Sequence, residues 1–182
     1  QGRLRIGIGT GWNEMEYEAL GENFHNRGKR SEEQVDLMRK LWSQELVTYQ
    51  GTYHKVTDAG LNPLPPRKSI PIWFGGLADP VLRRTAKLGD GWLPLSQNPA
   101  SNQKYLDRLE GYLEENERSM KEIGIEGRVP LNISDSEIRE NLFSWDRMGA
   151  THVSANAMNC GLKFPGEHIK ALSNFIKIAK ES

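Results

Sequence analysis

The chain has 182 residues, of which 37% are hydrophobic and 26% are charged, and its formal net charge is zero. This composition is typical of a soluble globular protein with one substantial core, and it argues against a nucleic-acid partner or an acidic tail. The single cysteine excludes an intrachain disulfide and favours a cytoplasmic location. No apolar run approaches the ~20 residues that span a bilayer, so we expect no membrane partner.

The N-terminal segment predicts a buried strand that opens into a ligand site. Residues 4–9 form an isoleucine-rich run, and alternating glycines continue as far as Gly11. This is not a dinucleotide-binding fingerprint, because no helix begins directly after the last glycine. Two interpretations stay open: the strand end holds a ligand, or the glycines only relax the end of the strand.

Five helices are predicted from caps and from apolar residues at helical spacing. Ser31 and Gln34 form the pattern of a capping box, and Asp79 followed by Pro80 is typical of a helix start. Gly124 is expected to stop the third helix. The last helix is expected to bury Ile169, Leu172, Phe175 and Ile176. The predicted helices cover residues 31–45, 79–88, 101–123, 135–148 and 166–180.

Strand-like runs alternate with these helices, which implies right-handed βαβ units and a parallel sheet. The predicted strands cover residues 4–9, 70–74, 91–94, 128–133 and 151–155. The irregular region 44–69 contains a predicted hairpin at Tyr49–His54 and a proline-rich connector. A loop of this length inside a compact domain usually has a function.

A second glycine pair follows the strand predicted at 70–74. Gly75 and Gly76 join it to the helix that starts at Asp79. Glycines let a backbone approach a phosphate, and free amides at a helix N-terminus attract an anion. Asp79 competes for those amides, however, and an ordinary tight turn explains the spacing equally well.

Aromatic residues lie near the predicted strand ends, but no catalytic constellation is visible. Trp12, Trp73 and Trp92 could wall an aromatic ligand; core packing is favoured for Trp73, and both interpretations stay open for the other two. The histidines lack metal-ligand spacing, so no metal is expected. The basic run 27–30 could bind an acid or a phosphate, but it is expected to be a solvated face or to pair with Glu32 and Glu33. Catalytic residues stay unknown, and a cofactor is expected to perform the chemistry.

Many spaced positions together resemble the bacterial luciferase-like monooxygenase family of flavin- or deazaflavin-dependent TIM-barrel oxidoreductases. The matching segments are 3–13, 16–21, Phe24, 27–30, Glu33, 41–42, Gly51, Pro63, Pro65, 71–76 and 89–92, with a weaker match at 148–153. The resemblance implies an α/β fold, a partial TIM-type (β/α) barrel with about five parallel strands that lacks the first three βα units. Residues 1–182 would be a single, N-terminally incomplete domain, and 126–136 looks shortened where the seventh strand should lie.

The resemblance also implies FMN or the deazaflavin coenzyme F420 as cofactor. The expected cofactor-binding residues are Thr10, Gly11, Trp12, Phe74, Gly75 and Gly76. Of these, Thr10 and Gly11 lie where the family approaches the phosphate-bearing chain of the cofactor, and Phe74, Gly75 and Gly76 match the turn that binds that phosphate. Trp12 lies where some deazaflavin-using relatives place a catalytic acid. Because this chain has a tryptophan there, acid catalysis from this position is in doubt.

The function implied is that of an oxidoreductase or monooxygenase that transfers a hydride or oxygen to a small organic substrate. Five parallel strands cannot close a barrel, so we expect a homo-oligomer or assembly with a missing N-terminal half, and little activity from this chain alone. The alternative is a non-catalytic truncated half-barrel that oligomerises or pairs with a separate N-terminal chain. A weaker alternative is a ligand-storage protein that binds the cofactor without turnover.

Overall fold

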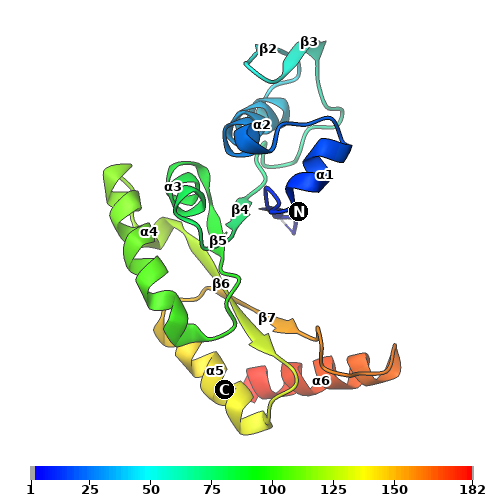
Figure 1. Ribbon diagram of the computed structural model, residues 1–182, viewed down its shortest axis with the longest axis vertical. Helices are drawn as coiled ribbons and strands as arrows, with labels where there is room; N and C mark the ends of the chain where they lie inside the picture. Colours follow the sequence, from blue (N-terminus) through cyan, green and yellow to red (C-terminus); the bar gives the residue numbers. More distant parts are fainter. Residues whose placement is uncertain (1–2, 182) are drawn as a thin grey trace. The chain divides into compact units, whose positions relative to one another are not determined.

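The computed structural model describes residues 3–181 and divides after Phe74 into two compact units. Each unit has its own strands and helices (Figure 1). The α/β class and the five parallel strands predicted from the sequence are confirmed. Among the described residues, no helix is both long enough and apolar enough to cross a membrane.

The first unit contains two parallel strands, β1 (Ile6–Ile8) and β4 (Ile72–Gly75), the last residue of which begins the second unit. Ile8 lies opposite Phe74 in the parallel ladder. Because the strands are parallel, the carboxyl end of β1 lies beside β4 at Phe74. Trp73 is buried within β4, which agrees with the core role favoured from the sequence.

The expectation that no helix follows the N-terminal glycines is wrong, because a short helix starts at Glu14, and the next helix begins earlier than predicted. The helices of the first unit are α1 (Glu14–Ala19), the 3-10 turn η1 (Phe24–Asn26) and α2 (Arg27–Ser43). The prediction that Ser31 caps a helix is wrong, because η1 continues directly into α2 and leaves Ser31 buried inside the helix. Asn23 provides the start instead, since its side chain accepts a hydrogen bond from the His25 amide at 2.8 Å.

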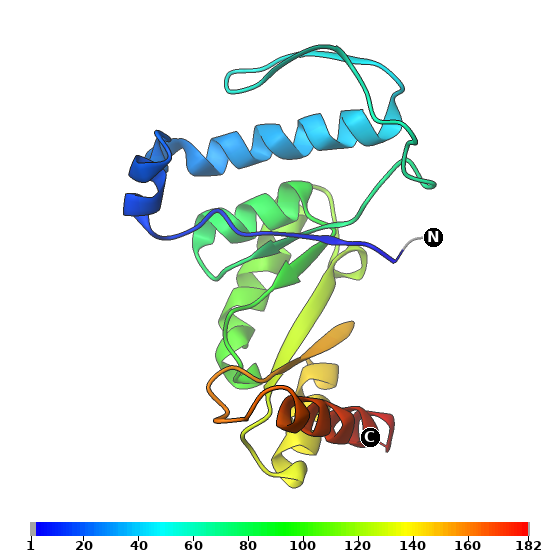
Figure 2. The same ribbon diagram turned by 90° about the vertical axis from the view of Figure 1, so that its right-hand side faces the viewer.

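The predicted hairpin is confirmed as two antiparallel strands, β2 (Val47–Gln50) and β3 (Lys55–Ala59). It runs alongside α2 (Figure 2). One side chain of α2, the carboxylate of Glu33, holds the turn of this hairpin.

Glu33 accepts hydrogen bonds from three consecutive backbone amides, those of Thr52, Tyr53 and His54, at 2.7–2.8 Å. The His54 Nδ1 lies 2.9 Å from the same carboxylate. Gly51 makes the close approach possible, because a Cβ there would lie 2.3 Å from Glu33 Oε1. Partial burial opposes ionisation, but the hydrogen bonds from His54, Tyr53 and Thr52 outweigh it and hold the pKa of Glu33 below its ordinary value.

The second unit contains three parallel strands in chain order: β5 (Gly91–Leu93), β6 (Gly124–Pro130) and β7 (His152–Asn156). Its helices are α3 (Asp79–Leu88), α4 (Gln103–Glu115), α5 (Asp135–Arg147) and α6 (Gly166–Glu181), with 3-10 turns η2 (Pro99–Asn102) and η3 (Met120–Glu122). β6 begins at Gly124 rather than at Arg128 and has 7 residues.

The third predicted helix ends much earlier than residue 123. α4 stops at Glu115, and Glu117 takes a left-handed conformation with a φ of 56°. The Arg118 amide then donates to the Leu113 carbonyl at 2.9 Å, and the Glu117 amide donates to the Glu114 carbonyl at 3.0 Å. This is the Schellman arrangement, with a glutamate at the position that glycine usually occupies. Gly124, the expected stop, instead begins β6.

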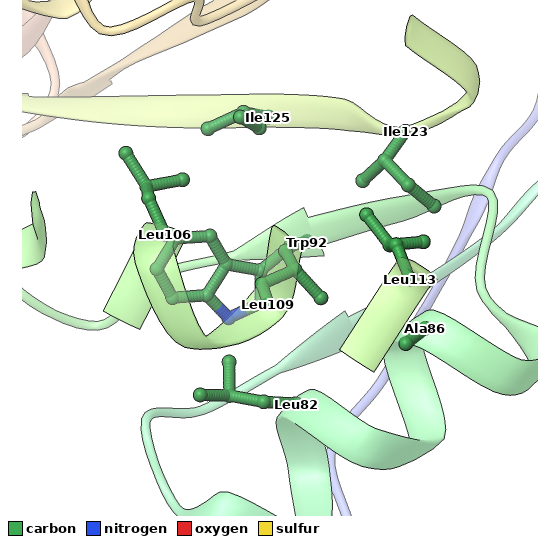
Figure 3. Close-up of a cluster of buried hydrophobic side chains, with 8 residues drawn as sticks. All are labelled: Leu82, Ala86, Trp92, Leu106, Leu109, Leu113, Ile123 and Ile125. Atoms are coloured by element: carbon green, nitrogen blue, oxygen red, sulfur yellow. The ribbon is translucent and has the colours of Figure 1, made fainter. Parts of the chain in front are cut away.

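The main core of the second unit lies between α3, α4 and the strands β5 and β6 (Figure 3). Its buried residues are Leu82, Ala86, Trp92, Leu106, Leu109, Leu113, Ile123 and Ile125. Trp92 is fully buried, and its Nε1 donates to the Gly76 carbonyl at 2.8 Å. Of the two interpretations left open for Trp92, the structure therefore supports core packing.

A second cluster packs α5 and α6 against β6. It consists of Val129, Ile138, Trp145, Phe175 and Ile178. The apolar face of α6 is therefore set by Phe175 and Ile178. The expectation that Ile169, Leu172 and Ile176 are buried is wrong, because they are 62%, 38% and 53% exposed.

We predict that Glu33→Gln loosens the hairpin. The neutral amide offers a weaker acceptor to the backbone donors, so amide hydrogen exchange at Thr52–His54 should accelerate by about tenfold. In the unmodified chain, the protection of the same amides relative to their intrinsic exchange rate should fall as pH drops below 4.5 and through the lowered pKa of Glu33, since only the ionised carboxylate is stabilised by these bonds. Glu18→Gln, on exposed α1, is the control; equal exchange in both variants would contradict the prediction.

We also predict that Gly127→Ala destabilises the second unit. A Cβ at this position of β6 would lie 2.5 Å from Trp145 Cγ in the second cluster. Overpacking of this kind costs roughly 1–3 kcal/mol, which thermal unfolding would register as a lower Tm. Gly111→Ala in α4 is the matched control, because nothing lies within 4 Å of its Cβ position. It should raise Tm slightly through helix propensity, and a neutral Gly127→Ala would refute the packing argument.

Candidate functional site

The segment after β1 is a braced loop. The Tyr17 hydroxyl donates a hydrogen bond to the Thr10 carbonyl, and Gly11 adopts a φ of 77°. A Cβ on Gly11 would lie 3.4 Å from the Tyr17 ring. Asn13 caps α1 by accepting from the Met15 amide at 3.2 Å. The loop that carries Thr10, Gly11 and Trp12 thus has a defined shape at the carboxyl end of its strand, where ligands bind in parallel α/β folds.

The three expected site residues of β4 and its turn differ in accessibility. The Phe74 side chain is 1% exposed and belongs to the interior. Gly75 and Gly76 follow it, and Gly76 has a φ of 133°. The Gly76 amide donates to the Leu93 carbonyl at 3.1 Å, so this amide is engaged by β5. Phosphate donors at this turn would therefore come from the amides that follow Gly76, at the start of α3.

The start of α3 has no side-chain cap. The expectation that Asp79 is the N-cap is wrong: Ala78 occupies that position, with extended φ and ψ and no side-chain cap hydrogen bond. Pro80 has no amide hydrogen, and the Val81 amide donates to the Ala78 carbonyl at 2.8 Å. The Asp79 carboxylate instead accepts from the Tyr112 hydroxyl at 2.6 Å and from Arg83 Nε at 3.4 Å. The Tyr112 hydrogen bond, more than Arg83, lowers the pKa of Asp79. The expected competition between Asp79 and an anion for these amides is thereby removed.

A cavity of about 510 Å³ lies at the carboxyl end of β6 in the second unit. It is bounded by the 97–100 loop, by Pro130 and Ile133, and by the α5 residues Glu137, Glu140, Asn141 and Ser144. Its lining mixes apolar side chains such as Ile133 with polar ones such as Asn141.

A cavity of about 760 Å³ in the first unit lies under the proline-rich connector. It is lined by Trp42, by connector residues 61–67, and by residues 3–4 and 69–71, which precede β1 and β4. Because residues 3–4 and 69–71 lead into β1 and β4, the cavity lies toward the amino ends of these two strands. Ligand sites of parallel barrels lie at the opposite edge, so this cavity is not the cofactor site.

The charged groups of the first unit form ion pairs that sequence spacing does not reveal. Arg30 pairs with Glu22, and Arg27 lies 3.6 Å above the Phe24 ring, so the basic run braces η1 rather than binding Glu33. His25 Nε2 lies 3.4 Å from Glu14 Oε1, on the exposed side of α1. Among residues 3–181, no group of three or more histidine, cysteine, aspartate or glutamate side chains could hold a metal ion.

Curated relatives match a large part of this chain but have longer chains. An F420-dependent glucose-6-phosphate dehydrogenase of Intrasporangium calvum is 35% identical over 113 residues, which cover 59% of this chain and 33% of the relative. The enzyme of the same description from Gordonia bronchialis is 28% identical over 87% of this chain and 49% of its own. The chain thus spans less than half the length of these relatives.

Solved structures share the fold. An F420-dependent secondary alcohol dehydrogenase in complex with an F420–acetone adduct matches 97% of this chain and 62% of its own, with a TM-score of 0.62 and 18% identity. The coenzyme F420-dependent tetrahydromethanopterin reductase of Methanopyrus kandleri matches 82% of this chain and 52% of its own, with a TM-score of 0.61 and 18% identity. The profile of the luciferase-like monooxygenases matches residues 1–174. The chain therefore belongs to the luciferase-like monooxygenase family.

Proposed function

We propose that this chain forms the cofactor-binding part of an oxidoreductase or monooxygenase that uses FMN or F420 to transfer a hydride or oxygen to a small organic substrate. Family membership and the F420-dependent relatives support this function. The observation that carries it is the α3 start: a glycine turn leads into a helix N-terminus that has no side-chain cap, and the nearby carboxylate of Asp79 is held by Tyr112. Uncapped amides at a helix N-terminus attract a phosphate.

In this proposal the turn from Gly75 to Ala78 and the first turn of α3 hold the cofactor's phosphate. Glycine at position 76 suits that role, because its φ of 133° and the Val81 side chain 3.4 Å from its Cβ position both oppose a larger residue. The loop at Thr10, Gly11 and Trp12 is proposed to contact the cofactor in the first unit. When bound, the cofactor supplies the redox chemistry, and the chain's residues position it. Catalytic residues are not assigned, and the single cysteine favours a cytoplasmic location.

The exposed face of α6 supports the proposal that the working protein contains further chain. Ile169 and Ile176 lie on α6 and are 62% and 53% exposed, and Val153 of the neighbouring β7 is 36% exposed. Such apolar surface is usually covered by a partner. A second copy of this chain or a separate N-terminal segment would cover it, and the chain by itself is expected to show little turnover because barrel active sites draw on many strand ends. A non-catalytic oligomeric protein is the alternative function that the same surface favours.

We predict that the purified chain has a solution mass above that of one copy. Changing both Ile169 and Ile176 to glutamate should shift the mass toward one copy, because charges oppose burial of this face. Multi-angle light scattering measures this directly, and Lys170→Glu on the same helix is the control for added charge. A monodisperse single copy for the unmodified chain would contradict the prediction.

The decisive test of the phosphate site is Ala78→Asp. Aspartate at this exposed N-cap has only the Val81 amide to accept from, because Pro80 has no N–H, but its charge also favours the helix N-terminus. α3 should therefore gain about 0.5–1 kcal/mol, and Tm should rise. The same carboxylate would occupy the position proposed for the phosphate and would repel the phosphate group, so the affinity for FMN or F420 should fall by about tenfold. A gain in stability together with a loss of affinity is an outcome that general damage to the fold cannot produce.

Two controls sharpen this test. Ala78→Ser caps the helix without a charge, so it should stabilise α3 with a smaller loss of affinity. Asp107→Asn, on the far side of α4, changes charge without touching α3 and should leave both properties unchanged. If Ala78→Asp raises Tm but binds FMN and F420 as the unmodified chain does, the phosphate does not bind at this helix.

A further inference from the structure

The cavity under the proline-rich connector has no role in the proposed function. Its volume of about 760 Å³ lies within the range of sites for small organic ligands. All of its lining residues belong to the first unit; they come from the segment before β1, the end of α2 and the connector that leads into β4. Because the cavity lies toward the amino ends of β1 and β4, a ligand there would not overlap a cofactor at their carboxyl ends.

A large part of the lining is apolar. The Trp42 side chain, near the end of α2, is 7% exposed. Leu64 and Ile70 are half-buried, and Leu4 and Leu61 are 61% and 43% exposed. Exposed leucines that share a cavity with a buried indole offer apolar area that an aromatic or aliphatic body would remove from water on binding.

The connector that lines the cavity has little conformational freedom. Four of the lining residues are prolines, each of which fixes its own φ at about −65°. The Lys68 amide donates to the Pro65 carbonyl at 2.8 Å, which closes a turn within the connector. The Ile6 amide donates to the Pro71 carbonyl at 2.8 Å, which joins the end of the connector to β1. A wall that is already ordered loses little conformational entropy when a ligand binds.

Two cationic side chains line the same cavity, those of the exposed residues Arg3 and Arg67. Among residues 3–181, neither guanidinium forms an ion pair with a carboxylate, and no aspartate or glutamate of this range lines the cavity. The cavity at the carboxyl end of β6, in contrast, has Glu137 and Glu140 in its lining. Charge therefore favours an anion in the cavity under the connector and opposes one in the cavity at β6.

We propose that the cavity under the connector is a second ligand site, which binds a small organic anion with an apolar body, such as an aromatic or short-chain carboxylate. Arg3 and Arg67 bind the anionic group, and Trp42 and the leucines contact the body. Arginine suits a carboxylate because its planar fork can donate two parallel hydrogen bonds. The inference goes beyond the proposed function and does not depend on it, since no residue of this cavity belongs to the proposed cofactor site.

A matched pair of fluorescent probes tests this site. Anilinonaphthalene sulfonate and phenylnaphthylamine share one aromatic body, but only the first carries a negative charge. The unmodified chain should bind both, and added salt should weaken the sulfonate alone. Arg3→Gln combined with Arg67→Gln should weaken the sulfonate by about tenfold and the neutral amine by less than about twofold. Lys29→Gln combined with Lys55→Gln removes the same charge from exposed positions outside the cavity and should change neither affinity.

The apolar contact is tested separately by Leu61→Ser. This change removes apolar area from the cavity, so both probes should weaken by about threefold. Leu46→Ser is the matched control, because Leu46 is also exposed but does not line the cavity, and it should change neither affinity. Naphthoate should displace the sulfonate from the unmodified chain, whereas the uncharged naphthalenemethanol should not, because only the carboxylate pairs with the two arginines.

Three results would overturn the proposal. In the first, the double arginine variant binds the sulfonate as tightly as the unmodified chain does, so the probe lies on another apolar surface. In the second, this variant keeps its Tm but loses both probes equally, so the arginines do not select an anion. In the third, the sulfonate binds only at dilutions at which light scattering shows a single copy, so a second copy of the chain covers the cavity instead.

Discussion

The turn at Gly76 is fixed by two hydrogen bonds to β5, and the proposed phosphate site depends on them. The Gly76 amide donates to the Leu93 carbonyl, and the Gly76 carbonyl accepts from the buried Trp92 indole. Because Trp92 lies at the centre of the main core, the position of this turn is coupled to the packing of α3 and α4. A buried indole N–H needs a partner, so core and turn constrain each other.

The helices whose ends could be predicted were those bounded by capping residues, proline or glycine within one helical turn. α3 was correctly bounded by Pro80 and Gly89, and α5 by the capping box of Ser134 and Glu137, because these signals act within one turn. The end of α4 could not be predicted, since Glu117 takes the left-handed position at which glycine is expected. The start of α2 was missed because η1 continues directly into α2, and the residue before α2 makes no side-chain cap hydrogen bond.

The site was predicted less well than the fold, since its properties depend on partners far away in sequence. The segments at Thr10–Trp12 and Gly75–Gly76 could be singled out from glycines at strand ends. Nothing local showed that Tyr112 would hold the Asp79 carboxylate, or that Trp12 would be exposed while Trp92 was buried. The hairpin was visible in the sequence, but the glutamate that clamps it lies 19 residues or more away.

The segments that follow β1 and β4 differ in how their acidic side chains are paired. At α3 the acidic side chain nearest the amides is bound by a tyrosine and an arginine, which leaves the helix terminus electropositive. At α1 the first turn keeps Glu14 and Glu16 exposed, and the loop before it presents an indole. An ionised carboxylate beside a helix start raises the cost of binding an anion there, and the pairing of Asp79 with Tyr112 and Arg83 reduces that cost at α3.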